Sequence, residues 1–278
     1  MKTEMRLRAK KSLGQHFLVE PGIIHKIISY ARFQGSDLVL EIGPGRGALT
    51  IPLAGSVGHV VAVEKDTGLA RALEGRLKRD GIDNVTLFND DILKWQFAEI
   101  ESQSSGKFMI IGNLPYNISS PFLEKLVENR KMVSRAILMF QAEVAQRLSA
   151  SPGSKTYGAM TLLVQYYARI TNLLSVSRNA FRPRPKVDSI VIELDFGRPY
   201  PTQTPHEDCF RKVVKGAFAH RRKTILNSLK GAHPSWEPGF IAEAMKRCEI
   251  DPGRRAETLH MDEFLALTSS LAAIDSGA

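Results

Sequence analysis

The fold of this chain is decided by residues 37–47, whose sequence is DLVLEIGPGRG. The mainly apolar stretch over residues 37–42 predicts a buried strand, and the glycines after it predict a tight turn into a helix that continues through Ala54. Because glycine has no Cβ, such a turn lets the backbone approach a ligand at the N-terminus of the helix. The stretch therefore predicts a strand–turn–helix unit with a ligand site at its centre.

Strand and helix patterns alternate around this unit. We expect strands at residues 60–64, 85–88, 108–111 and 136–140, and helices at residues 20–33, 66–79, 121–129, 142–150 and 158–168. Such alternation predicts an α/β fold with a parallel, doubly wound sheet, whose ligand lies at the carboxyl ends of the strands.

The pattern changes in the last third of the chain. Residues 170–176 and 190–196 resemble strands with no helix between them, which predicts an antiparallel pair at the end of the sheet. A linker rich in Pro and Thr follows, and the later patterns are helical. We expect one large domain over residues 1–200 and a small all-α domain over residues 206–278.

The composition is that of a soluble globular protein. The chain has 278 residues, 43% of them hydrophobic, and no apolar run approaches the ~20 residues that span a bilayer. The basic N-terminus has no apolar segment of the kind found in secretory signals. Cys209 and Cys248 are far apart, and the histidines do not cluster, so we expect no metal site and a reducing, cytoplasmic location.

The net charge of +9 points to a polyanionic partner. Lysine and arginine crowd residues 2–11, and the basic stretches 178–186 and 211–230 contain no acid. Solvated surface is the alternative for any one cluster. Together they favour nucleic acid, and the candidate RNA-binding residues are Arg182, Arg184, Arg221, Arg222 and Lys223.

The glycine turn carries the first candidate cofactor contacts. Gly43, Gly45 and Ala48 satisfy a loose dinucleotide-binding pattern, which alone is a weak signal. Glu41 and Gly47 extend it to E-x-G-x-G-x-G, the form seen in class I methyltransferases, and this favours S-adenosylmethionine over NAD. A purely structural turn is the alternative.

Two carboxylates follow the next strands. Glu64 lies about 20 residues after the glycines, where a carboxylate can accept both ribose hydroxyls of a cofactor; otherwise it is a surface acid. Asp90 and Asp91 follow the third strand, where a carboxylate can accept a hydrogen bond from the adenine amino group while Ile92 packs on the ring. A helix N-cap is the alternative for either aspartate.

Asn113-Leu114-Pro115-Tyr116 follows the fourth strand and suits chemistry on an exocyclic amine. The Asn113 side-chain oxygen and the Leu114 carbonyl can accept both N–H bonds of adenine N6, which directs its lone pair at a methyl sulfonium. Pro115 keeps Leu114 extended, and Tyr116 offers a face for the base. An ordinary turn is the alternative.

Phe181 lies in the basic, proline-rich loop between the last two strands. An aromatic residue there is often a core anchor. Flanked by arginines that hold phosphates, it can instead cover the opposite face of the target base.

These motifs together resemble the KsgA (RsmA) family of ribosomal RNA adenine dimethyltransferases. The matching segments are residues 14–18, 41–50, Glu64, Asp91, 113–116, 181–189 and 217–224. The resemblance implies a class I S-adenosylmethionine methyltransferase domain followed by a small helical domain that aids RNA or ribosome binding. It also implies N6,N6-dimethylation of two adjacent adenosines near the 3′ end of small-subunit rRNA, and we expect a monomer.

The resemblance also assigns residues that no pattern identifies. His16 and Leu18 become cofactor contacts, because the matching segment of the family closes over the cofactor. Many members have Asn where this chain has His16. The resemblance favours Asp91 over Asp90 for the adenine contact, and Asn113 is implied to touch both the cofactor and the target amine.

Three other functions remain open at this point. The large-subunit rRNA adenine methyltransferases that confer macrolide resistance share the glycine turn and the Asn-x-Pro-aromatic motif. A non-catalytic ribosome-assembly or nucleic-acid-binding relative has no need of Glu64, Asp91, Asn113 and Tyr116 together. An NAD oxidoreductase lacks a proton donor near a hydride site and leaves the basic clusters without a use.

Overall fold

The computed structural model describes residues 9–10, 13–101 and 106–275, which form two compact units. The first unit contains the chain up to Ala145 and Arg169–Gly197, and the second contains Gln146–Ala168 and the chain from Arg198 onward. Residues 146–168 belong to the large domain predicted from the sequence pattern, whereas in the structure they pack with the C-terminal helices.

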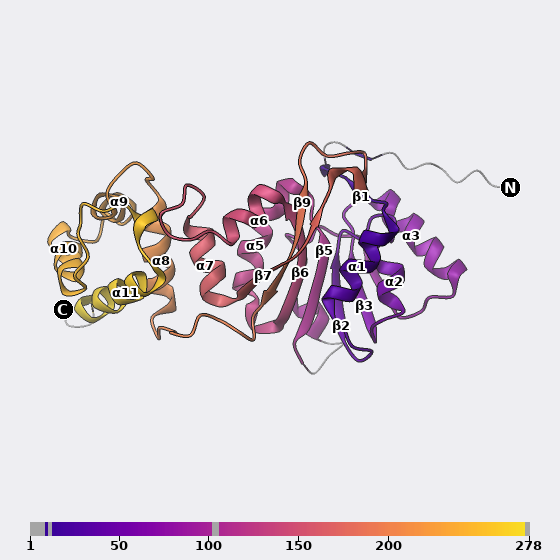
Figure 1. Cartoon of the computed structure of the whole chain (residues 1–278). Helices are drawn as coiled ribbons and strands as arrows, with labels where there is room; N and C mark the ends of the chain where they lie inside the picture. Colours follow the sequence, from indigo (N-terminus) through magenta and orange to yellow (C-terminus); the bar gives the residue numbers. More distant parts are fainter. Residues whose placement is uncertain (1–8, 11–12, 102–105, 276–278) are drawn as a thin grey trace. The chain divides into compact units, whose positions relative to one another are not determined.

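A seven-stranded sheet forms the centre of the first unit (Figure 1), in the order β4-β3-β2-β5-β6-β9-β7. Its strands are β2 (Leu38–Ile42), β3 (His59–Val63), β4 (Val85–Phe88), β5 (Phe108–Asn113), β6 (Val133–Gln141), β7 (Arg169–Val176) and β9 (Ser189–Asp195). Strands β2 to β6 run parallel, and β9 pairs antiparallel with both β6 and β7. The predicted parallel sheet and the predicted antiparallel pair at its end are both confirmed.

Helices cover both faces of this sheet (Figure 1). On one side lie α1 (Pro21–Ala31), α2 (Thr50–Ala54) and α3 (Thr67–Asp80), and on the other lies α5 (Ser119–Glu128). The shorter helices α4 (Ala98–Glu101) and α6 (Ala142–Leu148) complete the connections. Helix α3 begins at the N-cap Asp66 and ends at Gly81, whose φ of 67° gives the left-handed conformation that glycine adopts readily.

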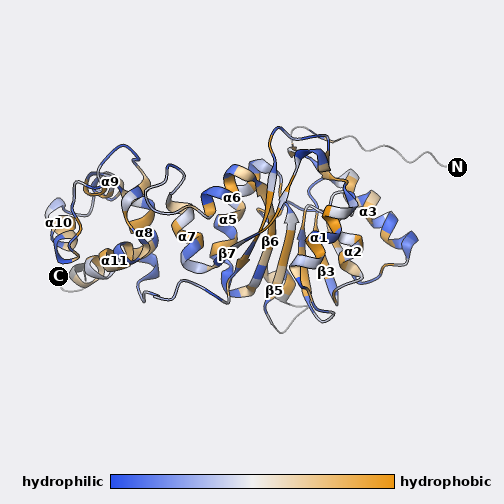
Figure 2. Cartoon of the chain, in the orientation of Figure 1, coloured by the Kyte–Doolittle hydropathy of each residue, from blue (hydrophilic) through white to orange (hydrophobic). Residues whose placement is uncertain are grey.

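The core lies on both faces of the sheet, because successive strand residues point to opposite sides. On the α1 side, Val39 and Ile111 belong to one buried apolar cluster. On the other side the rings of Phe97 and Phe108 lie 5.7 Å apart, and Phe122 packs beside them. Each such buried side chain contributes about 1.5–3 kcal/mol, and Figure 2 shows the apolar strands that this two-sided burial requires.

A two-stranded sheet joins distant parts of the first unit. Strand β1 (Phe17–Leu18) pairs antiparallel with β8 (Phe181–Arg182), which places Leu18 opposite Phe181. This sheet is not predictable from the sequence pattern, since strands of two residues show no periodicity.

The second unit is helical, as predicted for its C-terminal part. Its helices are α7 (Ala159–Tyr167), α8 (Glu207–Phe218), α9 (Ile225–Ala232), α10 (Pro238–Arg247) and α11 (Met261–Asp275). Aromatic contacts join them: Phe218 packs against Tyr157 and Phe264, and the rings of Tyr166 and Phe210 lie 4.4 Å apart. No helix in the described part of the chain is long and apolar enough to cross a bilayer.

Candidate active site

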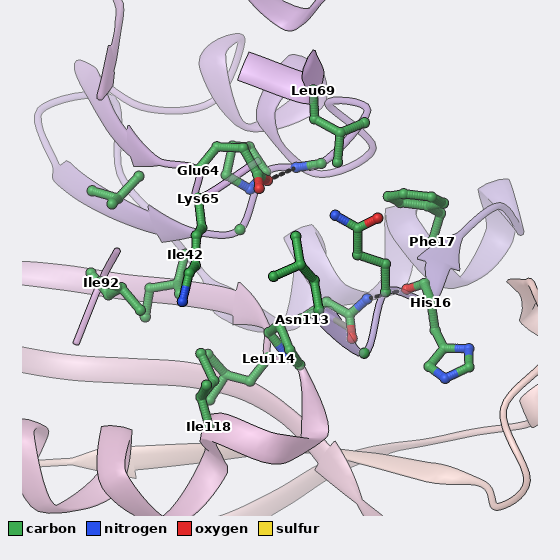
Figure 3. A pocket seen from close by; sticks show the side chains of 18 of the residues that line it. His16, Phe17, Ile42, Glu64, Lys65, Leu69, Ile92, Asn113, Leu114 and Ile118 are labelled. Atoms are coloured by element: carbon green, nitrogen blue, oxygen red, sulfur yellow. Dashed lines mark hydrogen bonds between the residues drawn. The ribbon is translucent and has the colours of Figure 1, made fainter. Parts of the chain in front are cut away.

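A pocket opens at the carboxyl ends of β2, β3, β4 and β5 in the first unit, where a doubly wound sheet places its ligand. The segments that follow these strands form its walls, at residues 41–46 with 48–49, 63–65, 90–92 and 113–118, and residues 13–18 form a further wall. Figure 3 shows how their side chains surround one hollow. Within the described ranges, no group of three or more His, Cys, Asp or Glu side chains is arranged to hold a metal ion.

The glycine turn forms the floor of the pocket in a conformation that demands glycine. Gly43 and Gly45 have φ values of 62° and 58°, in the left-handed region. A Cβ on Gly45 would lie 3.3 Å from the Phe17 ring, so the turn also lets the chain of residues 13–18 come close. The predicted approach of the backbone to a ligand is possible here.

Glu64 is a fixed hydrogen-bond acceptor at the end of β3. Its Oε2 accepts the N–H of Gly45 at 3.0 Å, and its Oε1 accepts the N–H of Asp66 at 2.8 Å (Figure 3 labels Glu64). The side chain is buried, and burial raises its pKa. Each carboxylate oxygen has a second acceptor position, so two ribose hydroxyls remain a possible ligand.

Asp91 lies on the pocket wall after β4, but its carboxylate already has partners. Its Oδ1 accepts the N–H of Leu93 at 3.0 Å, as the first residue of a tight turn does, and its Oδ2 is 2.7 Å from the Lys65 ammonium. Burial opposes the change, but the hydrogen bond from Lys65 holds the pKa of Asp91 below its ordinary value. Ile92 lines the same wall and is buried, as its proposed contact with adenine requires.

Asn113 ends β5, and its side-chain orientation is fixed. Its Nδ2 donates to the backbone oxygen of His16 at 2.9 Å, the bond drawn in Figure 3. Because the amide nitrogen is held there, Oδ1 is the side-chain atom left to accept hydrogen bonds from a ligand. The acceptor role predicted for Asn113 is therefore sterically and chemically available.

Tyr116 and His16 form a ring pair beside this amide. Their centroids lie 5.4 Å apart with an interplanar angle of 28°, a stacked arrangement. The Tyr116 hydroxyl is 3.3 Å from Ser189 Oγ, and burial raises its pKa. His16 Nδ1 donates to the Pro183 carbonyl at 2.8 Å, since that carbonyl can only accept.

The structure brings most of the candidate residues together. His16, Leu18, Gly43, Gly45, Glu64, Asp91, Asn113, Leu114 and Tyr116 all line the pocket. Phe181 does not: it is fully buried in the apolar cluster that contains Leu18, and it is absent from the pocket wall. The alternative of a core anchor therefore describes Phe181 in this structure, because pairing of β8 with β1 turns its ring into the core. Covering a base would require this side chain to turn outward.

The basic candidates are exposed in both units. In the first unit, Arg182 is the second residue of β8, and Arg184 lies on the loop between β8 and β9. Arg221, Arg222 and Lys223 are exposed between α8 and α9, in the second unit. Of the N-terminal basic cluster, only Lys10 falls within the described residues.

Sequence reasoning gave Glu41 only a place in the glycine motif, whereas the structure shows an unusual group. It is 1% exposed, and its Oε2 has no hydrogen-bond partner among the described residues. Burial, together with the charge of Glu64, raises the pKa of Glu41 to about 8. A buried oxygen without a partner at a pocket wall is a place for a cationic or hydrogen-bonding ligand.

A family described as "Ribosomal RNA adenine dimethylase" matches residues 6–273 of the chain. The chain belongs to this family. The match spans both units, so the resemblance inferred from the sequence motifs is confirmed. The ribosomal RNA adenine dimethylases are S-adenosylmethionine-dependent enzymes, and the alternative of an NAD oxidoreductase is wrong.

Individual relatives agree with the family. The "Ribosomal RNA small subunit methyltransferase A" of Desulforapulum autotrophicum is 45% identical over 269 residues, covering 96% of this chain and 94% of the relative. The protein of that name from Moorella thermoacetica is 43% identical over 275 residues, covering 96% and 94%. A dimethyladenosine transferase structure from Plasmodium falciparum has a TM-score of 0.75 and 29% identity, covering 91% of this chain and 96% of that chain.

A second solved structure supports the fold alone. The 23S rRNA methyltransferase ErmE has a TM-score of 0.69 at 23% identity, covering 92% of this chain and 99% of that chain. Together with the dimethyladenosine transferase structure, it confirms the predicted class I methyltransferase fold.

The pocket of this dimethylase fits S-adenosylmethionine chemically. The cofactor is a cation with a ribose and an adenine, and the pocket offers a buried, unpartnered Glu41 oxygen, two acceptors on Glu64 and an apolar wall at Ile92. The assignment of each residue to a part of the cofactor remains a prediction.

Proposed function

We propose that this chain transfers methyl groups from S-adenosylmethionine to N6 of two adjacent adenosines near the 3′ end of small-subunit rRNA. The family match and the names of the relatives support the RNA adenine substrate and the small subunit. The enzyme would act as a monomer in the cytoplasm, on the RNA or on the assembling subunit.

One observation supports the chemistry most directly: the bond from Asn113 Nδ2 to the His16 carbonyl. It leaves Asn113 Oδ1 as an acceptor beside the Leu114 backbone, at the mouth of a buried strand. Adenine N6 is a poor nucleophile because its lone pair is delocalised into the ring. Two acceptors for its N–H bonds hold the amine and turn the lone pair out of the ring plane.

The remaining pocket residues would hold the two reactants. When bound, S-adenosylmethionine supplies a methyl carbon activated by the sulfonium charge. Glu64 would accept the ribose hydroxyls, Asp91 the adenine amino group, and the turn at Gly43 and Gly45 would contact the methionine end. Tyr116 would stack on the target base, which must displace or slide past the His16 ring that now covers it. A strong base is unnecessary, because the N6 proton becomes acidic as the new C–N bond forms and passes to water.

The second unit would add binding energy for the RNA. Arg221, Arg222 and Lys223 are exposed cations on one turn, suited to phosphate contacts. Arg182 at the end of β8 and Arg184 on the loop before β9 would make similar contacts.

A labelled methyl-transfer assay tests this function. Small subunits from cells without the methylation, their naked rRNA, and large-subunit RNA are each incubated with the enzyme and labelled S-adenosylmethionine. We expect dimethylation of two adjacent adenosines in small-subunit material only. Labelling of large-subunit RNA instead would favour the macrolide-resistance type, and no labelling of any substrate would favour the non-catalytic relative.

A further inference from the structure

Asp66 has more hydrogen-bond partners than its place in the fold requires. It caps helix α3, where its Oδ1 accepts the N–H groups of Gly68 at 2.9 Å and Leu69 at 3.3 Å. One oxygen is enough for this cap, and serine, threonine or asparagine serves equally well at such a position.

The second oxygen of Asp66 faces the N-terminal part of the chain. Its Oδ2 is 2.9 Å from the Lys10 ammonium and accepts a hydrogen bond from Gln15 Nε2 at 3.2 Å. Gln15 Oε1 in turn accepts the Lys10 N–H at 2.8 Å. The Asp66 side chain is 4% exposed and that of Lys10 is 57% exposed, so only the carboxylate side of this ion pair is shielded from water.

These bonds fasten one end of a segment that covers the pocket. Residues 13–18, here called the strap, all line the pocket. The other end of the strap is held by the pairing of β1 with β8. Between the ends, the Asn113 amide holds the His16 carbonyl, and the Arg46 guanidinium lies 4.6 Å from the centroid of the Phe17 ring.

The fastening point is also linked to the ligand side of the pocket. The N–H of Asp66 donates to Glu64 Oε1 at 2.8 Å, so one two-residue turn carries both the predicted ribose acceptor and the anchor of the strap. A ligand that leaves past the strap would displace the strap from whichever end is held less firmly. Within the described residues, the bonds to Asp66 at one end are made by side chains, whereas the β1 end has backbone bonds and the buried Leu18.

We propose that Asp66 is a positioning residue that fastens the strap over the bound cofactor through Lys10 and Gln15, and so sets the residence time of the cofactor. The inference rests on the proposed placement of the cofactor beside Glu64. Loss of these bonds should raise the dissociation rate of the cofactor more than it changes the association rate, because the open pocket is unchanged.

Asp66→Ser tests the fastening, since serine keeps the helix cap but has no carboxylate for Lys10 and Gln15. The probe is S-adenosylhomocysteine, and stopped-flow binding gives its association and dissociation rates. We expect a dissociation rate about tenfold higher, an association rate within about twofold, and an almost unchanged melting temperature. Asp66→Ala should also lower the melting temperature, because it removes the cap.

Lys10→Met is a second test of the fastening, and it leaves the helix cap at Asp66 unchanged. Lys10 is exposed, so the variant folds, and we expect its dissociation rate to rise several-fold. Asp66→Ser with Lys10→Met should release the product no faster than Asp66→Ser alone, because both remove one interaction. Lys78→Met is the matched control: it removes an exposed ion pair of 2.7 Å with Glu74 on α3 and should change neither rate.

Two results would overturn the fastening role: an unchanged dissociation rate in Asp66→Ser, or fully additive effects of Asp66→Ser and Lys10→Met. Failure of the proposed substrate would look different, since wild-type protein would then bind S-adenosylhomocysteine normally but leave small subunits unmethylated.

Discussion

The pocket of the first unit and the α8–α9 turn of the second unit differ in how far their polar side chains are buried. In the pocket, Glu41, Glu64 and Asn113 are buried or half-buried, and Glu64 and Asn113 have partners at fixed distances. On the turn at residues 219–224, the cations are exposed. A buried polar group acts through its fixed geometry, so no neighbouring side chain can replace it. Exposed cations act through their summed charge, and dissolved salt screens that charge. Single substitutions should therefore have large effects in the pocket and small ones on the turn.

Asn113→Ala should show the largest effect. The loss of the oriented Oδ1 should lower kcat by about 100-fold or more, since a placed electrostatic group has a value of that order. Binding of S-adenosylhomocysteine should survive, weakened by about tenfold at most. Single-turnover methylation and product binding measure the two effects.

Asn129→Ala is the matched control for that variant. The Asn129 amide also donates to a backbone carbonyl, that of Lys125 at 2.8 Å, but it lies at the end of α5 outside the pocket. It should leave kcat unchanged. Full methyl transfer by Asn113→Ala would contradict the acceptor role of Asn113.

Glu64→Gln should weaken cofactor binding by about tenfold or more, because hydrogen bonds to a charged group are worth about 1.5–3 kcal/mol. The two Glu64 oxygens face the N–H groups of Gly45 and Asp66, so the amide nitrogen of glutamine would meet a donor. Isothermal titration with S-adenosylhomocysteine measures the change. Glu243→Gln, which removes an exposed carboxylate on α10 paired with Arg247, is the control. Wild-type affinity in Glu64→Gln would remove Glu64 from the cofactor site.

Neutralising the three exposed cations of the α8–α9 turn tests whether this turn contacts RNA phosphates. Changing Arg221, Arg222 and Lys223 to glutamine should weaken binding to small-subunit RNA and flatten its salt dependence, by up to about 2 in the slope of log K against log salt. Filter binding over a range of salt concentrations measures this slope.

A second triple variant controls for total charge. Lys246, Arg247 and Arg255 are also exposed in the second unit, and their change to glutamine removes the same charge elsewhere. If both triple variants show the wild-type slope, the α8–α9 turn is solvated surface and does not contact phosphate.

Glu41→Gln should change the pH dependence of stability, and the size of that change tests how far burial perturbs the pKa of a pocket group. Burial raises the pKa of Glu41 from 4.5 to about 8, so the folded chain holds this proton more tightly than the unfolded chain. The contribution of Glu41 to stability is therefore complete below pH 4.5 and is lost as the pH rises to about 8. Glutamine cannot titrate.

The melting temperature of Glu41→Gln relative to the wild type should therefore rise between pH 5 and pH 9, by roughly 10 °C. Calorimetric scans at several pH values measure this difference. A constant difference over the whole range would mean that Glu41 titrates normally.

The central sheet could be predicted because the sequence patterns that indicate its strands and its glycine turn lie within short stretches of the chain. Each strand that is buried on both faces is a continuous apolar run, and the turn at Gly43 and Gly45 needs glycine at set positions. Residues 60–64 and 85–88 were predicted within a residue of β3 and β4 for this reason.

The remaining contacts join distant residues and leave no local pattern. Asn113 and the His16 carbonyl are 97 positions apart, and Gln15 and Asp66 are 51 apart. The two-residue strand β8 turned Phe181 into the core, although a basic loop around an aromatic residue suggests an exposed ring. The sequence pattern is enough to predict an N-cap aspartate such as Asp66. It does not predict that the second carboxylate oxygen of this residue faces Lys10 and Gln15.

Helix α7 belongs to the second unit although it precedes β7 and β9 in the chain. Its Tyr166 packs on Phe210 of α8 and accepts, through its backbone oxygen, the N–H of Tyr200. The helical unit is thus assembled from two stretches of one gene. Exchanging the last 80 or so residues between related enzymes would replace only part of its interior. A viable chimaera would need a second junction, so that α7 is inherited together with the helices that bury it.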